Sequence, residues 1–136
     1  DTITARALIG GPRRAYGTLA ASVTVMSGGV ALIAQQSAPA RALVARLVPG
    51  EAARIERHDG ANITIVCSGA MVDIGELDGQ SLGLAVTSEA ITASIGGVAK
   101  VSCDPAKDPI APESGAWGIA ATANGSLAIV TLAASR

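Results

Sequence analysis

Few residues in this 136-residue chain are of the types that carry catalytic or metal chemistry. The single histidine, His58, stands beside Asp59, but the base of a hydrolase triad must be oriented by its acid through space. Adjacent strand residues point to opposite faces, and the chain has no Gly-x-Ser-x-Gly nucleophile motif. One histidine and two distant cysteines also lack the ligand spacing of a zinc site. We therefore predict no catalytic residue, no metal site and no cofactor, and expect His58 to be an exposed turn residue.

Three acids, Asp73, Glu76 and Asp78, lie close together and could be nominated as a pair of glycosidase carboxylates. A glycosidase also needs aromatic platforms and a deep cleft to hold its sugar, whereas this chain has only Tyr16 and Trp117 as aromatics. The same shortage argues against a sugar-binding site and against stacking of single-stranded bases. We expect these acids to solvate a loop and the protein not to be an enzyme.

The charge distribution argues against nucleic acid and membrane partners. Ten Lys and Arg residues balance eleven Asp and Glu, for a net charge of −1, and the bases are scattered apart from Arg13-Arg14. A phosphate backbone would find no polycationic stripe to bind. No stretch reaches the roughly 18 uninterrupted apolar residues of a membrane-spanning helix.

The cysteines predict the redox environment of the chain. Two cysteines in a low-charge sequence rich in Ser, Thr and Gly indicate one disulfide, Cys67–Cys103, that joins two strands in an oxidising compartment. The alternative is a pair of buried thiols in a cytosolic protein. The chain begins at Asp1 rather than Met, which fits a mature product that has lost a signal peptide, although a fragment made for expression could begin the same way.

Alternating apolar residues predict strands through most of the chain. Residues 2–9 alternate and end at a Gly-Gly-Pro break. Residues 17–26 and 30–34 are predicted to form a hairpin through the Ser-Gly-Gly turn between them. A second hairpin is expected at Asp59-Gly60, and the clearest one at Asn124-Gly125.

Three other segments have less regular patterns of apolar residues. Residues 37–58 fit either a helix face or a strand, and β-branched neighbours favour the strand. Residues 71–74 could add one more short strand, whereas residues 104–114 contain three prolines and predict an exposed loop.

Together these signals predict an all-β protein. Roughly eight to ten short strands with Gly, Pro, Asp-Gly and Asn-Gly between them indicate an Ig-like or Greek-key β-sandwich, since long crossover helices are absent. We assign residues 1–12 to an N-terminal extension and residues 13–136 to the sandwich domain.

The N-terminal strand offers a candidate interface. Its apolar residues Ile3, Ala5, Ala7 and Ile9 could pair with the open sheet edge of a neighbouring subunit, as in donor-strand exchange. Alternatively, residues 2–9 form the first strand of their own sandwich.

In layout, the chain resembles the bacterial chaperone-usher pilins and related secreted surface-fibre β-sandwiches. An alternating N-terminal extension is followed by Tyr16-Gly17-Thr18-Leu19, which opens the first sandwich strand, and then by an Ig-like run of strands. The resemblance implies a cell-surface filament built from copies of this chain, with a periplasmic chaperone and an outer-membrane usher as possible partners. Two alternatives stay open: a phage or virion structural or decoration protein, and a small secreted binding module that uses the 104–114 loop as its contact surface.

Overall fold

The computed structural model describes residues 3–8, 13–122 and 125–135, and for Ile3–Leu8, Met26 and Val130 it describes the backbone alone. In this part of the chain it contains eleven strands and one 3-10 turn, η1 (Pro105–Lys107), but no α-helix. The strands are β1 (Ile3–Leu8), β2 (Gly17–Ser27), β3 (Val30–Ala38), β4 (Arg41–Leu47), β5 (Ala52–Asp59), β6 (Asn62–Met71), β7 (Ser81–Val86), β8 (Ile91–Ile95), β9 (Val98–Cys103), β10 (Ala116–Thr122) and β11 (Ser126–Ser135).

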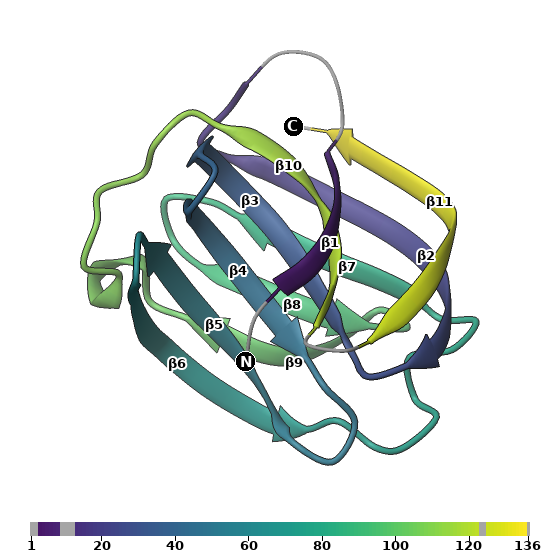
Figure 1. The fold of residues 1–136 in the computed structure, drawn as a ribbon. Coiled ribbons are helices and arrows are strands. Elements are labelled where there is room, and N and C mark those ends of the chain that lie inside the picture. Colours follow the sequence, from purple (N-terminus) through teal and green to yellow (C-terminus); the bar gives the residue numbers. More distant parts are fainter. Residues whose placement is uncertain (1–2, 9–12, 123–124, 136) are drawn as a thin grey trace.

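The strands form two antiparallel sheets that pack face to face. One sheet has six strands in the order β1-β10-β3-β4-β5-β6, and the other has five in the order β11-β2-β7-β8-β9. Figure 1 shows the six-stranded sheet in front of the five-stranded one. The predicted β-sandwich fold is therefore confirmed.

The core lies between the two sheets and is built mainly from aliphatic side chains. Leu19 and Val23 of β2 face inward, and Leu43 and Leu47 do the same from β4. Trp117 is the one large aromatic in this layer, with 2% of its surface exposed. Inward residues alternate with outward ones because successive side chains of a strand point to opposite faces. None of the described residues belongs to a helix long and apolar enough to cross a membrane.

The predicted disulfide is present and joins the two sheets. Cys67 lies in β6 and Cys103 in β9, each the last strand of its sheet, and their Cα atoms are 5.7 Å apart. The bridge thus holds the two sheets together along one side of the sandwich. No described cysteine is a free thiol.

Two of the predicted hairpins are wrong, because the chain changes sheet at both turns. β2 pairs with β11 and β7, whereas β3 pairs with β10 and β4. Likewise, β10 lies in the six-stranded sheet and β11 in the five-stranded one. The two crossings pack together: a Cβ on Gly28 would lie 2.8 Å from Gly125 Cα, and Gly29 N donates to Thr122 Oγ1 at 2.9 Å. The glycines permit a close approach of two backbones rather than a tight same-sheet reversal.

Of the remaining local predictions, two are right and one is wrong. Residues 37–58 are extended, as β4 and β5, so the strand reading is right. The Asp59-Gly60 hairpin is confirmed, with Gly60 at φ 63° between the paired β5 and β6. The separate short strand at residues 71–74 is not formed, since Met71 ends β6 and a loop follows.

The N-terminal strand joins the sheet of its own chain. β1 is an edge strand that pairs antiparallel with β10, with Ala5 opposite Ala121 and Ala7 opposite Ile119. This arrangement corresponds to the alternative in which residues 2–9 form the first strand of their own sandwich. Ile9, the fourth residue of the predicted donor strand, lies outside the described residues.

Candidate functional site

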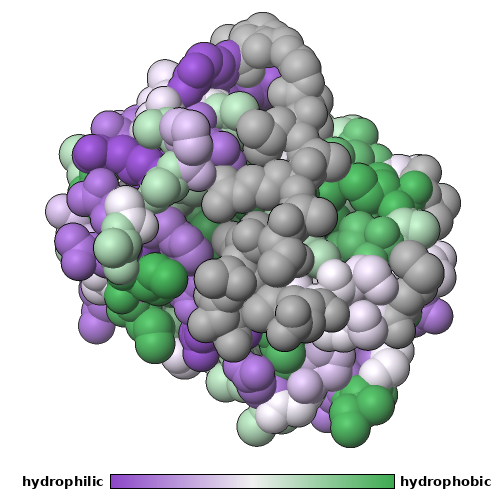
Figure 2. All heavy atoms as spheres, in the orientation of Figure 1, coloured by the Kyte–Doolittle hydropathy of each residue, from purple (hydrophilic) through white to green (hydrophobic). Residues whose placement is uncertain are grey.

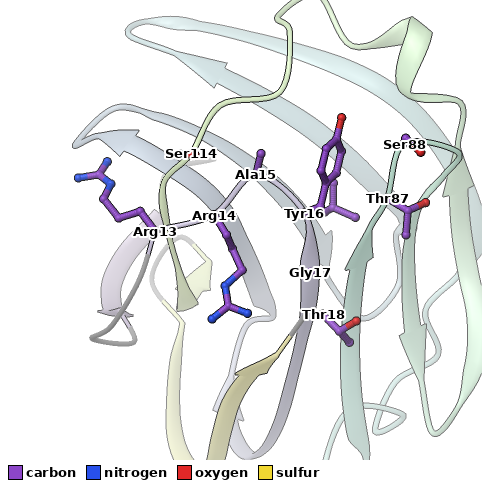
Figure 3. Close-up of a pocket in the computed structure, with 10 residues that line it drawn as sticks. Arg13, Arg14, Ala15, Tyr16, Gly17, Thr18, Thr87, Ser88 and Ser114 are labelled. Atoms are coloured by element: carbon purple, nitrogen blue, oxygen red, sulfur yellow. The ribbon is translucent and has the colours of Figure 1, made fainter.

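A groove of about 630 Å³ opens where β2 begins and β7 ends. Tyr16 stands in it with 46% of its surface exposed, whereas Trp117, the other aromatic, is buried. Figure 3 shows the Tyr16 ring on the side of Thr87 and Ser88, with Arg14 extending the other way. The lining residues come from three separate segments: Arg13, Arg14, Ala15, Tyr16, Gly17 and Thr18; Val86, Thr87 and Ser88; and Ser114.

The segment that carries Tyr16 is fixed through its backbone. Arg14 N donates to Gly115 O at 3.1 Å, and Arg14 O accepts from Gly115 N at 3.2 Å and from Trp117 Nε1 at 3.0 Å. Ala15 O accepts from Gln35 Nε2 at 2.8 Å. A Cβ at position 115 would collide with the backbone of Gln35. The glycine therefore lets the chain before β10 lie directly against the backbone of β3.

The opposite wall is a compact turn after β7. Thr87 N donates to Ala90 O at 2.9 Å, and Thr87 Oγ1 accepts from Glu89 N and Ala90 N, both at 3.1 Å. Such side-chain-to-backbone bonds are typical of turns that begin with Ser or Thr. The turn places Ser88 exposed beside the groove, so that its hydroxyl can accept or donate a hydrogen bond.

A buried polar network lies behind the groove. Arg57, with 1% of its side chain exposed, donates through Nε and Nη2 to the two carboxylate oxygens of Asp108 at 3.0 and 2.6 Å. The same Nη2 donates to Gln35 Oε1 at 2.8 Å. Gln35 has a φ of 54°, which non-glycine residues rarely adopt, and it lies where the pairing register of β3 shifts. Strained conformations of this kind persist where the surroundings hold them in place. Gln35 thereby connects the Ala15 carbonyl at the groove to a buried ion pair.

The groove lining combines an aromatic ring with several polar side chains. An exposed tyrosine offers an apolar face and a polar tip, and Thr18, Ser88 and Ser114 contribute hydroxyls to the same lining. Sites for small ligands commonly join an apolar platform to a few directed polar groups. Within the described part of the chain, no group of three His, Cys, Asp or Glu side chains is placed to hold a metal ion.

A second polar cluster lies on the outer face of the six-stranded sheet. Glu56 accepts from Arg54 Nε at 2.6 Å and lies 2.9 Å from His58 Nε2, and all three belong to β5. Beside them, Ile63 and Ile65 of β6 are about half exposed, at 50% and 53%. Figure 2 looks onto this face and shows polar surface interrupted by separate apolar patches on the side of β5 and β6.

The environment of Glu56 sets its acidity. Burial raises the pKa of this carboxyl, but hydrogen bonds from His58 and Arg54, together with their charges, outweigh burial and hold the pKa below its ordinary value of 4.5. The folded protein therefore binds this proton less tightly than the unfolded chain does. Its contribution to stability is present above pH 4.5 and is lost as the pH falls through the lower folded-state pKa.

We expect Glu56→Gln to flatten the acid side of the stability profile. Urea unfolding between pH 3 and pH 7 should show a smaller loss of unfolding free energy in the variant than in the wild type. Some dependence should remain, because hydrogen bonds from Lys100 and from the Asp73 backbone also lower the pKa of Glu76. Parallel profiles for wild type and variant would contradict this assignment.

The residues considered as site candidates from the sequence lie in different parts of the structure. His58 is not an exposed turn residue, since it lies within β5 with 12% of its side chain exposed. Two of the three clustered acids have partners for their carboxylates: Glu76 pairs with Lys100 at 2.6 Å and accepts from the backbone N of Asp73, and Asp78 accepts from Val25 N at 3.1 Å. The 104–114 loop contributes Ser114 to the groove, but its Asp108 points into the buried network.

The sequence did not nominate Tyr16 as a site residue, because the presence of only two aromatics argued against a sugar-binding site. One signal was available in the sequence. Arg13-Arg14 stands directly after the Gly-Gly-Pro break, and Tyr16 comes two positions later. This segment lacks the alternation of apolar and polar residues that would bury a large side chain. The residues opposite it, Thr87 and Ser88, are 71 and 72 positions away and carry no motif that connects them to Tyr16.

Comparison with known proteins identifies similar folds. No protein-family model matches the sequence, and no curated protein is similar to it in sequence. Among solved structures, the carbohydrate binding module CBM66 from Bacillus subtilis is similar, with a TM-score of 0.73 and 8% identity over 89% of this chain and 75% of that chain. A tetrameric galectin from the ball sponge Cinachyrella sp. has a TM-score of 0.64 and 12% identity, over 97% of this chain and 100% of that chain. At these identities the similarity establishes a shared β-sandwich fold.

Proposed function

We propose that this domain is a small secreted module without enzymatic activity that binds saccharides in the Tyr16 groove. The observation that carries the proposal is the position of Tyr16, the one exposed aromatic of the chain, in a groove whose lining also includes hydroxyl residues and two arginines. Similarity in fold to a protein described as a carbohydrate binding module supports it. The disulfide fits an oxidising, extracellular environment.

The groove offers two kinds of contact to a sugar. The Tyr16 ring supplies a flat apolar surface against which the C–H face of a sugar ring can pack. Hydroxyls of Ser88 and Ser114 and the guanidinium groups can pair with sugar hydroxyls, which both donate and accept hydrogen bonds. Because hydrogen bonds from Gly115 and from the Gln35 side chain hold the main chain of Arg14 and Ala15 in place, little ordering of this backbone is needed on binding.

Removal of the Tyr16 ring tests the proposal. We expect Tyr16→Ala to weaken binding of the best saccharide in a panel of neutral and acidic oligosaccharides by at least about tenfold, since truncation of a central aromatic contact commonly costs more than 1.4 kcal/mol. Tyr16→Phe, which keeps the ring, should retain most of the affinity. Isothermal titration calorimetry measures both.

The matched control is Val98→Ala, which shortens an exposed side chain (63% exposed) that does not line the groove. It should bind as the wild type does. Equal affinity of wild type and Tyr16→Ala would rule out this site. The absence of binding to any saccharide of the panel would rule out this function.

A filament subunit is the second candidate, and one observation favours it. β1 lies at a sheet edge and pairs with β10 alone, so an equivalent strand of another subunit could take its place. This candidate predicts a polymer of this chain that depends on Ile3, Ala5, Ala7 and Ile9, with a chaperone and usher as assembly partners. Light scattering after size-exclusion chromatography distinguishes it from the binding module, which should elute as a discrete species.

A further inference from the structure

We infer that the Tyr16 groove selects acidic saccharides, which carry a carboxylate or a sulfate group, over neutral ones. The inference rests on the proposed function and adds a ligand class to it. Its basis is two arginines at the groove whose charges no described acid neutralises.

Arg14 is held in place while its charged end is left for a ligand. Its backbone N and O are bonded to Gly115, and its O also accepts from Trp117. Its guanidinium makes no hydrogen bond or ion pair with the residues that the structure describes. Figure 3 shows this side chain extending along the start of β2 toward Thr18, a hydroxyl residue that lines the same groove.

Arg13 adds a second positive charge at the same groove. Its Nη2 donates to the backbone carbonyl of Gln36 at 3.1 Å, so its one recorded partner is neutral. The hydrogen bond ties the side chain to β3 without cancelling its charge. Figure 3 shows the guanidinium groups of these two consecutive arginines directed apart, so each adds a positive charge to a different part of the lining.

The nearby acids have other partners or lie outside the lining. Of the described residues that line the groove, none is acidic. Glu113, which precedes the lining residue Ser114, accepts from Arg41 Nε at 2.8 Å and from Ser37 Oγ at 3.2 Å. Glu89 follows Ser88 on the exposed turn but is not a lining residue. The groove therefore has a net positive lining.

A guanidinium recognises two oxygens of one anion through paired N–H donors, both in planar carboxylates and in tetrahedral oxyanions. Sugar carboxylates and sulfate esters present such oxygens, whereas a neutral sugar offers hydroxyls, which gain no charge-assisted hydrogen bond. The attraction should weaken as salt rises, because both arginines are accessible to solvent.

The test compares oligosaccharides that differ only in charge. Wild-type protein is titrated with a neutral galactose oligomer and the galacturonic acid oligomer of the same linkage and length, and separately with a sulfated oligomer and its desulfated counterpart. We expect at least about tenfold tighter binding of one acidic member, and the pair in which this occurs identifies the anion. In 0.5 M NaCl the ratio should fall.

The variants locate the effect. Arg14→Gln should bring the ratio of acidic to neutral affinity close to one, and Arg14→Lys, which keeps the charge but not the planar fork, should give an intermediate ratio. Lys107→Gln removes the same charge from the exposed η1 turn outside the groove and should leave the ratio unchanged. Thermal melting curves of each variant check that the fold is retained.

Equal binding of neutral and acidic members, with affinity that still falls in Tyr16→Ala, would overturn the inference and leave the proposed function in place. A preference for acidic members that survives in Arg14→Gln would also overturn it. Binding of neither class would overturn the proposed function together with the inference.

Discussion

Asp108→Ala is expected to lower the free energy of unfolding by about 3–5 kcal/mol, because it leaves a charge buried without its partner. Asp108 accepts two hydrogen bonds from Arg57, whose side chain is only 1% exposed, and the Asp108 side chain is itself 6% exposed. The remaining partner of Arg57, Gln35, is neutral and cannot replace the carboxylate. Urea unfolding followed by circular dichroism measures the loss.

Two further variants show whether the buried charge is the cause. Lys107→Ala changes the exposed neighbouring residue and should alter stability by less than about 0.5 kcal/mol. The double variant Arg57→Leu, Asp108→Ala removes both charges and should recover part of the lost unfolding free energy, since an apolar pair carries no desolvation penalty. A single variant as stable as the wild type would show that the ion pair is not required inside the sandwich.

Loss of the disulfide is expected to lower the free energy of unfolding by roughly 3–4 kcal/mol, because the bridge closes a long loop in the unfolded chain. Cys67 and Cys103 are 36 positions apart and connect the last strands of the two sheets. The urea midpoint of the wild type should therefore fall when a reductant is added. Cys67→Ala, Cys103→Ala should already be at the lower midpoint.

The double alanine variant is also the control for the reductant. Its midpoint should be the same with and without reductant, since it has no bridge to break. If the reductant shifts the urea midpoint of the wild type no further than that of the variant, the bridge contributes nothing measurable to stability.

The fold class and the disulfide could be predicted from the sequence because both depend on local patterns. Alternation places apolar side chains on one face of each strand, as in β7 and β8, whatever the partner strand is. The sheet to which a strand belongs depends on contacts with distant segments. Gly28-Gly29 and Gly125 are turn residues in either topology, and only their packing against one another reveals that the chain changes sheet there.

The candidate site was less accessible to prediction, since it is assembled from three distant segments. Arg14 is hydrogen-bonded to Gly115, which is 101 positions away, and Ser88 lies in the turn after β7. The pairing of Arg57 with Asp108 depends on a loop whose prolines predicted only exposure. Side-chain types indicated what each residue could do, but its neighbours follow from the topology.

The most direct test of saccharide binding in the Tyr16 groove is a titration of ¹⁵N-labelled protein with the best oligosaccharide of the panel, followed by amide NMR spectra. We predict that the largest shifts fall on Tyr16, Thr87, Ser88 and Ser114, which come from the three lining segments. Amides of Arg54 and Ile65, on the outer face of the six-stranded sheet, should change little. Shifts concentrated on Arg54 and Ile65 with none at Tyr16 would place the binding site on that sheet and contradict the assignment of the groove.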